Sequence, residues 1–245
     1  VAIMRILVTN DDGVYSPGIA ALAQVASRFG QVRIVAPDVE MSSASHSITA
    51  SRPVNYKRTP LPHVEAYRVN GTPGDCVMLG TTLWRDVDVV LSGINIGTNL
   101  GNAIWHSGTL AAAKQAVLLG VRGIALSTPV GKEDPDFEIL EPFVKEVLQK
   151  LLKSNELALY NVNFPPRRNE PLKGVRICRQ ANAKWVEDFD QRFDPSLLAH
   201  PHGEERRHDI GLLVAAGVGQ QGRRVVEGEE REVEEAGVEV ASLAG

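Results

Sequence analysis

The sequence is poor in the features that stabilise small secreted proteins or anchor proteins in membranes. Two cysteines in 245 residues, Cys76 and Cys178, are too few for a disulfide framework and are typical of a reducing compartment. No apolar run approaches the roughly 18 residues of a transmembrane helix. The apolar stretch Ile6–Val8 is too short for a signal peptide. We therefore expect a cytoplasmic protein with no membrane span.

The chain also lacks an excess of basic residues. Its net charge is -4, and residues 201–245 carry ten acidic against five basic residues, so the first 200 residues are close to neutral. Stable binding to nucleic acid needs a basic surface, which this charge distribution does not predict. A small phosphorylated ligand held by a few local groups remains compatible with it.

Short apolar runs alternate with amphipathic stretches along most of the chain. Runs that are continuously rich in Val, Ile and Leu are typical of strands buried on both faces, and their alternation with helices indicates an α/β fold with a mostly parallel sheet and helices on both faces. The predicted strands are Arg5–Thr9, Val32–Ala36, Val87–Leu91, Val121–Ser127 and Leu157–Val162. The predicted helices are Gly18–Phe29, Thr109–Leu119 and Asp136–Leu152.

One segment interrupts this alternation. Two extended stretches, Arg52–Tyr56 and Val64–Val69, predict a β-hairpin excursion from the main sheet. In the following "NGTPGDCV", Pro73 is expected at the first position of a helix, with Thr72 as its N-cap.

Two adjacent acids follow the first predicted strand. Asp11 and Asp12 repel each other at close range, and a hard divalent cation such as Mg²⁺ or Mn²⁺ would cancel that repulsion. In an open α/β sheet, ligands bind at the carboxyl ends of the strands, where these acids lie. The alternative is purely structural: Asp11 caps the following turn, and Asp12 begins an Asp-Gly turn with Gly13.

The loop "SGINIGTNLG" follows the Val87–Leu91 strand. Its glycines allow close approach to an anion, while Asn95 and Asn99 offer amide groups to a metal or a phosphate. It matches neither a Walker A motif nor a dinucleotide fingerprint, so a structural turn is the alternative.

The segment "HSGTLAAAKQA" begins a strongly helical run. Ser107, Gly108 and Thr109 stand where free backbone N–H groups and the helix dipole favour an anion, although ordinary N-capping explains the same residues. His106 beside them is a possible accessory residue that protonates a leaving group or holds a phosphate. A lone histidine is more often a packing or surface residue.

A serine-rich loop, "MSSASHSIT", surrounds His46. A serine–histidine hydrolase is disfavoured because the chain has no G-x-S-x-G elbow and no acid placed to complete a triad. A serine hydroxyl that serves as an extra metal or phosphate ligand is the preferred interpretation.

Taken together, five segments resemble the SurE family of stationary-phase survival proteins. They are "MRILVTNDDGVYSPGI", "VAPDVEMSSASHSIT", "NGTPGDCV", "LSGINIGTNLG" and "HSGTLAAAKQA", in that order along the chain. The resemblance implies a Rossmann-like core and a metal-dependent 5'/3'-nucleotidase, a phosphatase acting on nucleoside monophosphates. It also implies a homodimer or tetramer.

The same resemblance implies the residues of the site. One divalent metal ion, Mg²⁺ or Mn²⁺, would be held by Asp11, Asp12, Ser42 and Asn95. The phosphate pocket would be lined by Asn99, Ser107, Gly108 and Thr109. Asp11 and Asp12 are the expected catalytic residues, and either of them could accept the proton of an attacking water.

The carboxyl-terminal part departs from the family pattern. No aromatic residue follows Phe193, and eight of the last 45 residues are glycine. We therefore expect a Rossmann-like phosphatase domain over residues 1–195 and a divergent tail over 196–245, whose composition favours disorder.

Two other functions are compatible with parts of this sequence. One is a catalytically impaired protein that binds nucleotide and metal without turnover. The other is a receiver-like signalling module, which requires a strand-end Asp and a later strand-end Lys where this chain has "SGIN" and "STP". The nucleotidase is the function that the motifs favour most.

Overall fold

The computed structural model describes residues 3–131, 135–153, 157–165, 174–178 and 180, and three short strands at 190–191, 213–214 and 238–242. The chain divides into two compact units, residues 1–183 with 233–245, and residues 184–232. In the second unit, the described strands β9 (Asp190–Gln191) and β10 (Leu213–Val214) pair antiparallel. The predicted domain boundary at residue 195 and most of the predicted tail lie outside the described residues.

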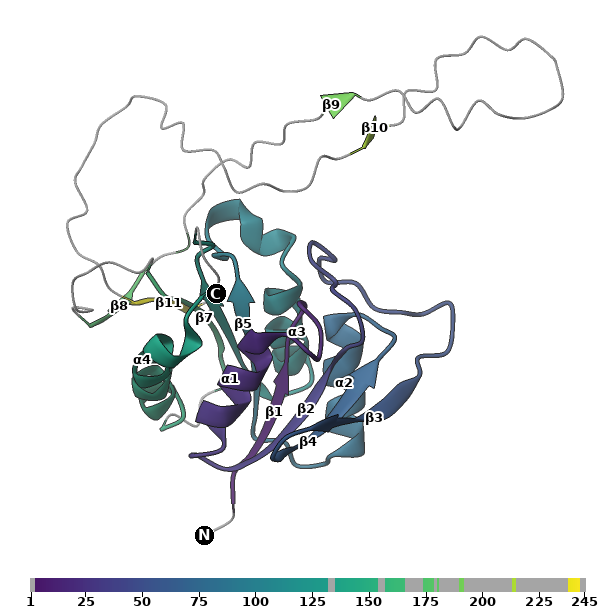
Figure 1. Ribbon diagram of the computed structural model, residues 1–245, viewed down its shortest axis with the longest axis horizontal. Coiled ribbons are helices and arrows are strands. Elements are labelled where there is room, and N and C mark those ends of the chain that lie inside the picture. The colour runs from purple at the N-terminus through teal and green to yellow at the C-terminus, as the bar shows by residue number, and fades with distance from the viewer. Residues whose placement is uncertain are drawn as a thin grey trace, which may run out of the picture. The chain divides into compact units, whose positions relative to one another are not determined.

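The first unit is built on one sheet with strand order β3-β4-β2-β1-β5-β6-β7-β11-β8 (Figure 1). Its strands are β1 (Arg5–Thr9), β2 (Gln31–Pro37), β3 (Tyr56–Leu61), β4 (Val64–Val69), β5 (Val89–Ile96), β6 (Arg122–Thr128), β7 (Leu159–Asn163), β8 (Val175–Ile177) and β11 (Val238–Ser242). The pairs from β4 through β2, β1, β5 and β6 to β7 are all parallel, whereas β3 pairs antiparallel with β4 and β11 with β7. The predicted α/β fold with a mostly parallel sheet is confirmed.

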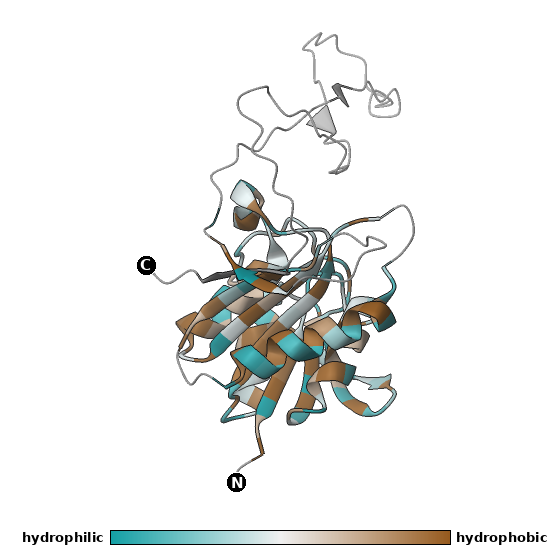
Figure 2. Cartoon of the chain, turned by 90° about the vertical axis from the view of Figure 1, so that its left-hand side faces the viewer, coloured by the Kyte–Doolittle hydropathy of each residue, from teal (hydrophilic) through white to brown (hydrophobic). Residues whose placement is uncertain are grey.

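Helices cover both faces of the sheet, as predicted. They are α1 (Pro17–Ala26), α2 (Pro73–Leu83), α3 (Gly108–Leu118) and α4 (Phe137–Leu151), with a short 3-10 helix η1 (Gly101–Trp105) before α3. α1 and α4 pack on one face, and α2 and α3 pack on the other. Figure 2 shows apolar residues concentrated on the strands of the sheet. Within the described residues, no helix is long and apolar enough to cross a bilayer.

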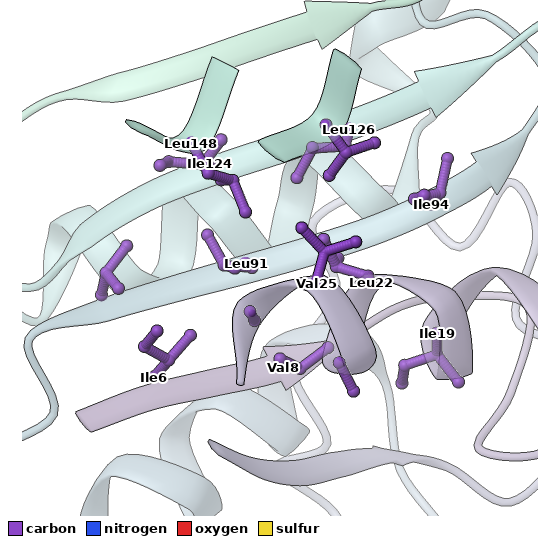
Figure 3. Packing of buried hydrophobic residues seen from close by; sticks show 14 of the residues in the cluster. Ile6, Val8, Ile19, Leu22, Val25, Leu91, Ile94, Ile124, Leu126 and Leu148 are labelled. Atoms are coloured by element: carbon purple, nitrogen blue, oxygen red, sulfur yellow. The ribbon is translucent and has the colours of Figure 1, made fainter. Parts of the chain in front are cut away.

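The core under α1 and α4 is made of fully buried aliphatic side chains. Leu22 and Val25 of α1 lie over Leu91 of β5, and Ile124 of β6 packs near Leu148 of α4 (Figure 3). Each fully buried Leu or Ile stabilises the fold by roughly 1.5–3 kcal/mol relative to an exposed position. This core keeps the central strands β1, β5 and β6 in fixed register.

Helix caps fix where the helices start. The Ser16 hydroxyl accepts from the Ile19 N–H at the start of α1. At α2, Thr72 and Asp75 form a reciprocal capping box around Pro73, which confirms the predicted cap and first helical residue. Removing such a cap lowers the free energy of unfolding by about 1 kcal/mol.

The hairpin differs from the prediction in two respects: the position of its first strand along the chain, and its attachment to the main sheet. The strand lies at Tyr56–Leu61, not at Arg52–Tyr56, and β4 joins the main sheet through its parallel pairing with β2. Pro60 in the sequence argues against a strand there. Because β3 is the edge strand, however, the missing N–H of Pro60 removes no bond that the sheet needs.

β5 is longer than predicted and includes part of the expected loop. It continues to Ile96, with a shift of register between Ser92 and Asn95, so Asn95 pairs with Ser127 of β6. The expected loop starts only at Gly97. Asn95 is therefore held on a strand end, which places its side chain more rigidly than a loop would.

The strand β11 comes from the predicted tail and lies inside the sheet. Val240 is paired on one side with Val162 of β7 and on the other with Ile177 of β8. The carboxyl-terminal segment thus gives β7 a second hydrogen-bonded neighbour.

Val240→Pro is expected to lower the free energy of unfolding by about 3 kcal/mol, because proline cannot donate a ladder hydrogen bond inside a sheet. Val240→Thr keeps the N–H and the β-branched shape, and should remain within about 1 kcal/mol of wild type. Urea unfolding of both variants measures the difference. Equal stability of the proline and threonine variants would show that β11 adds nothing to the sheet.

Candidate active site

The polar segments meet where the strand order reverses. From β1 the chain runs to β2 on one side, and it later returns to β5 on the other side of β1. The carboxyl ends of β1 and β5 therefore flank a topological switch point, the usual place for a ligand crevice in such sheets. Asp11 and Asp12 follow β1 there, and Asn95 lies near the end of β5.

Asp11 is buried and tied to the start of α3. Its Oδ1 accepts a 2.5 Å hydrogen bond from the Thr109 hydroxyl. Burial raises the pKa of Asp11, while the Thr109 hydroxyl and the backbone N–H groups of Thr109 and Gly108 oppose that rise. A Cβ on Gly108 would lie 2.7 Å from the Asp11 Cβ. Only glycine therefore permits this approach of helix and carboxylate.

Asp12 is the less satisfied member of the pair. Its Oδ2 is buried and has no hydrogen-bond partner in the part of the chain that the structure describes. Burial first, and then the negative charges of Asp11 and Glu40, together raise the pKa of Asp12 to about 7, against the opposing effect of the Ile96 N–H. Without a cation, this carboxyl is therefore only partly ionised at neutral pH.

The donor set around Asp12 fits a hard divalent cation. A buried carboxylate oxygen without a partner is what a cation would satisfy. Among the described residues, no cluster of three or more His, Cys, Asp and Glu forms a metal site. Further protein ligands of a cation bound by the acid pair would therefore be hydroxyl, amide or backbone oxygens, with water completing the shell.

The two predicted neutral ligands lie on the segments that flank the acid pair. The backbone N–H of Met41 donates to the Asp11 carbonyl at 2.7 Å, which brings the serine-rich segment to the end of β1. Ser42 is exposed, and its hydroxyl donates to Glu40 Oε1 at 2.7 Å. The Asn95 amide donates to the Gly97 carbonyl at 2.6 Å, so its Oδ1 is not the atom used in that bond.

The predicted phosphate-lining residues are all at the carboxyl edge of the sheet. Ser107 caps α3, since its hydroxyl accepts from the Leu110 N–H at 3.1 Å. Asn99 is buried, and its Nδ2 donates to the Ser127 hydroxyl at 2.8 Å. Thr109 and Gly108 face Asp11. The helix start therefore already contacts one acidic group, the Asp11 carboxyl.

His46 and His106 lie beside the site and form no triad. His106 is exposed, and its carbonyl accepts from the Ser45 N–H at 3.1 Å. His46 contacts Gln115 Oε1 through Nε2 at 2.9 Å. The Ser45 hydroxyl donates to the Trp105 carbonyl. These contacts hold the serine-rich loop in place and form no catalytic triad. They therefore agree with the sequence, which has no serine hydrolase motif.

Sequence reasoning missed Asn10, which organises the loop that carries the acids. It is fully buried, and its Nδ2 donates to the Gly13 carbonyl at 3.0 Å and to the Ser16 hydroxyl at 2.7 Å. The sequence did contain a signal for this role, because Asn10 is a polar residue directly between a buried strand and two acids. Glu40 was missed as well, and its charge acts on Asp12.

A mostly parallel sheet with paired carboxylates, amide side chains and a helix start at its switch point defines a class of α/β proteins built around a ligand crevice. Within that class the chain belongs to the SurE family, because the family model "Survival protein SurE" matches residues 6–187.

Individual relatives agree with this assignment. A 5'-nucleotidase SurE from Cytophaga hutchinsonii is 43% identical over 197 residues, which cover 78% of the chain and 76% of that protein. The 5'-nucleotidase SurE 1 from Thermus thermophilus is 40% identical over 213 residues, which cover 82% and 84%. The crystal structure of the SurE protein from Aquifex aeolicus matches with a TM-score of 0.71 and 32% identity over 98% of this chain and 92% of that one.

The unusual pKa of Asp12 predicts a pH-dependent effect in chelator-treated protein. The carboxyl has a pKa of about 7 when folded and near 3.8 when unfolded, so the folded state loses stability as the pH rises through that window. Asp12→Asn cannot ionise, and is expected to be more stable than wild type by up to about 4 kcal/mol at about pH 8. Near pH 4 or below, the difference should largely vanish.

Urea unfolding at the two pH values with EDTA present tests this. Asp38→Asn removes an exposed carboxylate nearby and should change stability by no more than about 0.5 kcal/mol. A stabilisation by Asp12→Asn that does not depend on pH would contradict the assigned pKa.

Proposed function

We propose that the chain is a divalent-metal-dependent nucleotidase that hydrolyses nucleoside 5'- or 3'-monophosphates to nucleoside and phosphate. The observation that carries the proposal is the unpartnered, buried Oδ2 of Asp12 beside Asp11 at the switch point. Family membership adds support, since the relatives compared above carry the name 5'-nucleotidase. A homodimer or tetramer remains a prediction.

One Mg²⁺ or Mn²⁺ is the proposed cofactor, with Asp11, Asp12, Ser42 and Asn95 as its ligands. A bound divalent cation supplies Lewis-acid polarisation of a phosphoryl oxygen and lowers the pKa of water. The carboxylates supply negative charge, and the hydroxyl and amide supply neutral oxygens, a mixture that suits hard cations.

The two acids have different surroundings, which supports different roles. Thr109 holds Asp11 through Oδ1, so Asp11 serves as an anchor between β1 and α3. Asp12 Oδ2 has no protein donor. We therefore assign Asp12 Oδ2 to the cation, and the acid pair as a whole is the proposed acceptor of the attacking water's proton.

The phosphate is proposed to lie between the Asn99 loop and the start of α3. The Asn99 amide has a second N–H besides the one given to Ser127, and the dipole of α3 favours negative charge near Ser107, Gly108 and Thr109. These groups would stabilise charge on the equatorial oxygens as the bond breaks. His106 at the exposed rim is an accessory candidate.

The first test of the function is phosphate release from a panel of nucleoside monophosphates with Mg²⁺ or Mn²⁺. Turnover is expected with wild type, and Asp12→Asn or EDTA should reduce kcat by about a hundredfold or more, because both remove the metal's charge stabilisation. Asp38→Asn should leave the rate unchanged. Metal binding by calorimetry without turnover would instead indicate a catalytically impaired binding protein.

Gly108→Ala tests the approach between α3 and Asp11. The added Cβ would meet the Asp11 side chain at 2.7 Å and displace it. We expect kcat/KM to fall by about 10- to 100-fold, since a misplacement of about 1 Å costs that much at a reacting centre. Leu118→Ala, at an exposed position of the same helix, should have no effect. A fully active Gly108→Ala enzyme would argue against Asp11 in the site.

A further inference from the structure

A buried amide network surrounds Asn99 and has no role in the chemistry described so far. The Asn99 N–H donates to Asn163 Oδ1 at 2.8 Å. The Asn99 carbonyl accepts from Asn161 Nδ2 at 2.8 Å and from Asn163 Nδ2 at 3.2 Å. Both polar groups of the Asn99 backbone are therefore held by side chains of one strand, β7.

The network is closed and deeply buried. Asn163 Nδ2 also donates to Asn161 Oδ1 at 3.2 Å, and Ser127 of β6 accepts from the Asn99 side chain. Asn161 is 1% exposed, and Asn163 is 4% exposed. Buried polar groups are costly unless satisfied, and a satisfied network specifies a single arrangement of its members.

The sheet does not need these amides to hold its strands together. Strands β6 and β7 already pair through their backbones from Gly123 with Leu159 to Ser127 with Asn163. What the amide side chains add is a fixed position for a segment that follows β5, a strand that does not pair with β7. The effect of the network is thus concentrated on Asn99.

We propose that Asn163 and Asn161 are positioning residues that fix Asn99 for phosphate binding, with Ser127 orienting its side-chain amide. This inference rests on the proposed function, because it gives Asn99 the phosphate of the substrate as its ligand. Asn163 holds both backbone groups of Asn99, whereas Asn161 holds only the carbonyl. Their effects should therefore be graded.

The experiment compares Asn163→Ala and Asn161→Ala with wild type. We expect Asn163→Ala to raise the KM for a nucleoside monophosphate and the inhibition constant of inorganic phosphate by about 10- to 100-fold, as expected for a displaced binding group. Asn161→Ala should raise both by a smaller factor. Mn²⁺ affinity, measured by calorimetry, should stay within about twofold of wild type, because Asn99 is not a proposed metal ligand.

The control is Asn70→Ala, which removes a comparable side-chain-to-backbone contact outside the Asn99 network. Asn70 Oδ1 accepts from the Asn55 N–H at 2.7 Å in the hairpin region. This variant should keep the wild-type KM and phosphate inhibition. Thermal unfolding of all variants reports how much of any change is loss of folded protein.

Wild-type phosphate inhibition in both Asn163→Ala and Asn161→Ala would overturn the inference. A parallel loss of Mn²⁺ affinity and phosphate affinity would also overturn it, since that would indicate a general structural role. Failure of the proposed function looks different, because wild type would then turn over no nucleoside monophosphate. In that case, calorimetry with inorganic phosphate as the probe still tests whether the amides position an anion site.

Discussion

The close pairing of Asp11 and Asp12 is the constraint on which the rest of the site depends. Two carboxylates at a buried strand end are tolerated only if each has a compensating partner. Thr109 satisfies Asp11, and the absence of a side chain at Gly108 lets α3 approach closely enough to do so. Asp12 Oδ2 has no such partner among the described residues, which is why the pair is best understood as half of a cation site.

The order of the strands makes this arrangement possible. The first strand lies in the middle of the sheet, and the chain departs from it on one side and returns on the other. Groups that are more than eighty positions apart in sequence, such as Asp11 and Asn95, are thereby brought to one edge. The helices that follow these strands start at the same edge, so their polar N-termini point toward the acids.

The central strands and helices could be predicted because burial alone dictates their apolar pattern. The edge strand could not, since Pro60 and the charged residues of β3 are acceptable only at an edge, and being an edge is a property of the whole sheet. The acids, the amide loop and the helix start were visible as motifs. Asn161 and Asn163 were not, because nothing in "YNVN" reveals a partner more than sixty residues earlier.

The position of β11 has a consequence for how the protein is made. β7 carries the two asparagines and is completed by a strand that lies far later in the sequence. Until that strand has been synthesised, one edge of β7 is an open row of unpaired backbone groups, which can pair with a wrong strand. This late strand therefore protects the part of the sheet that supports the site, and nascent chains halted before β11 would be the ones most prone to aggregate.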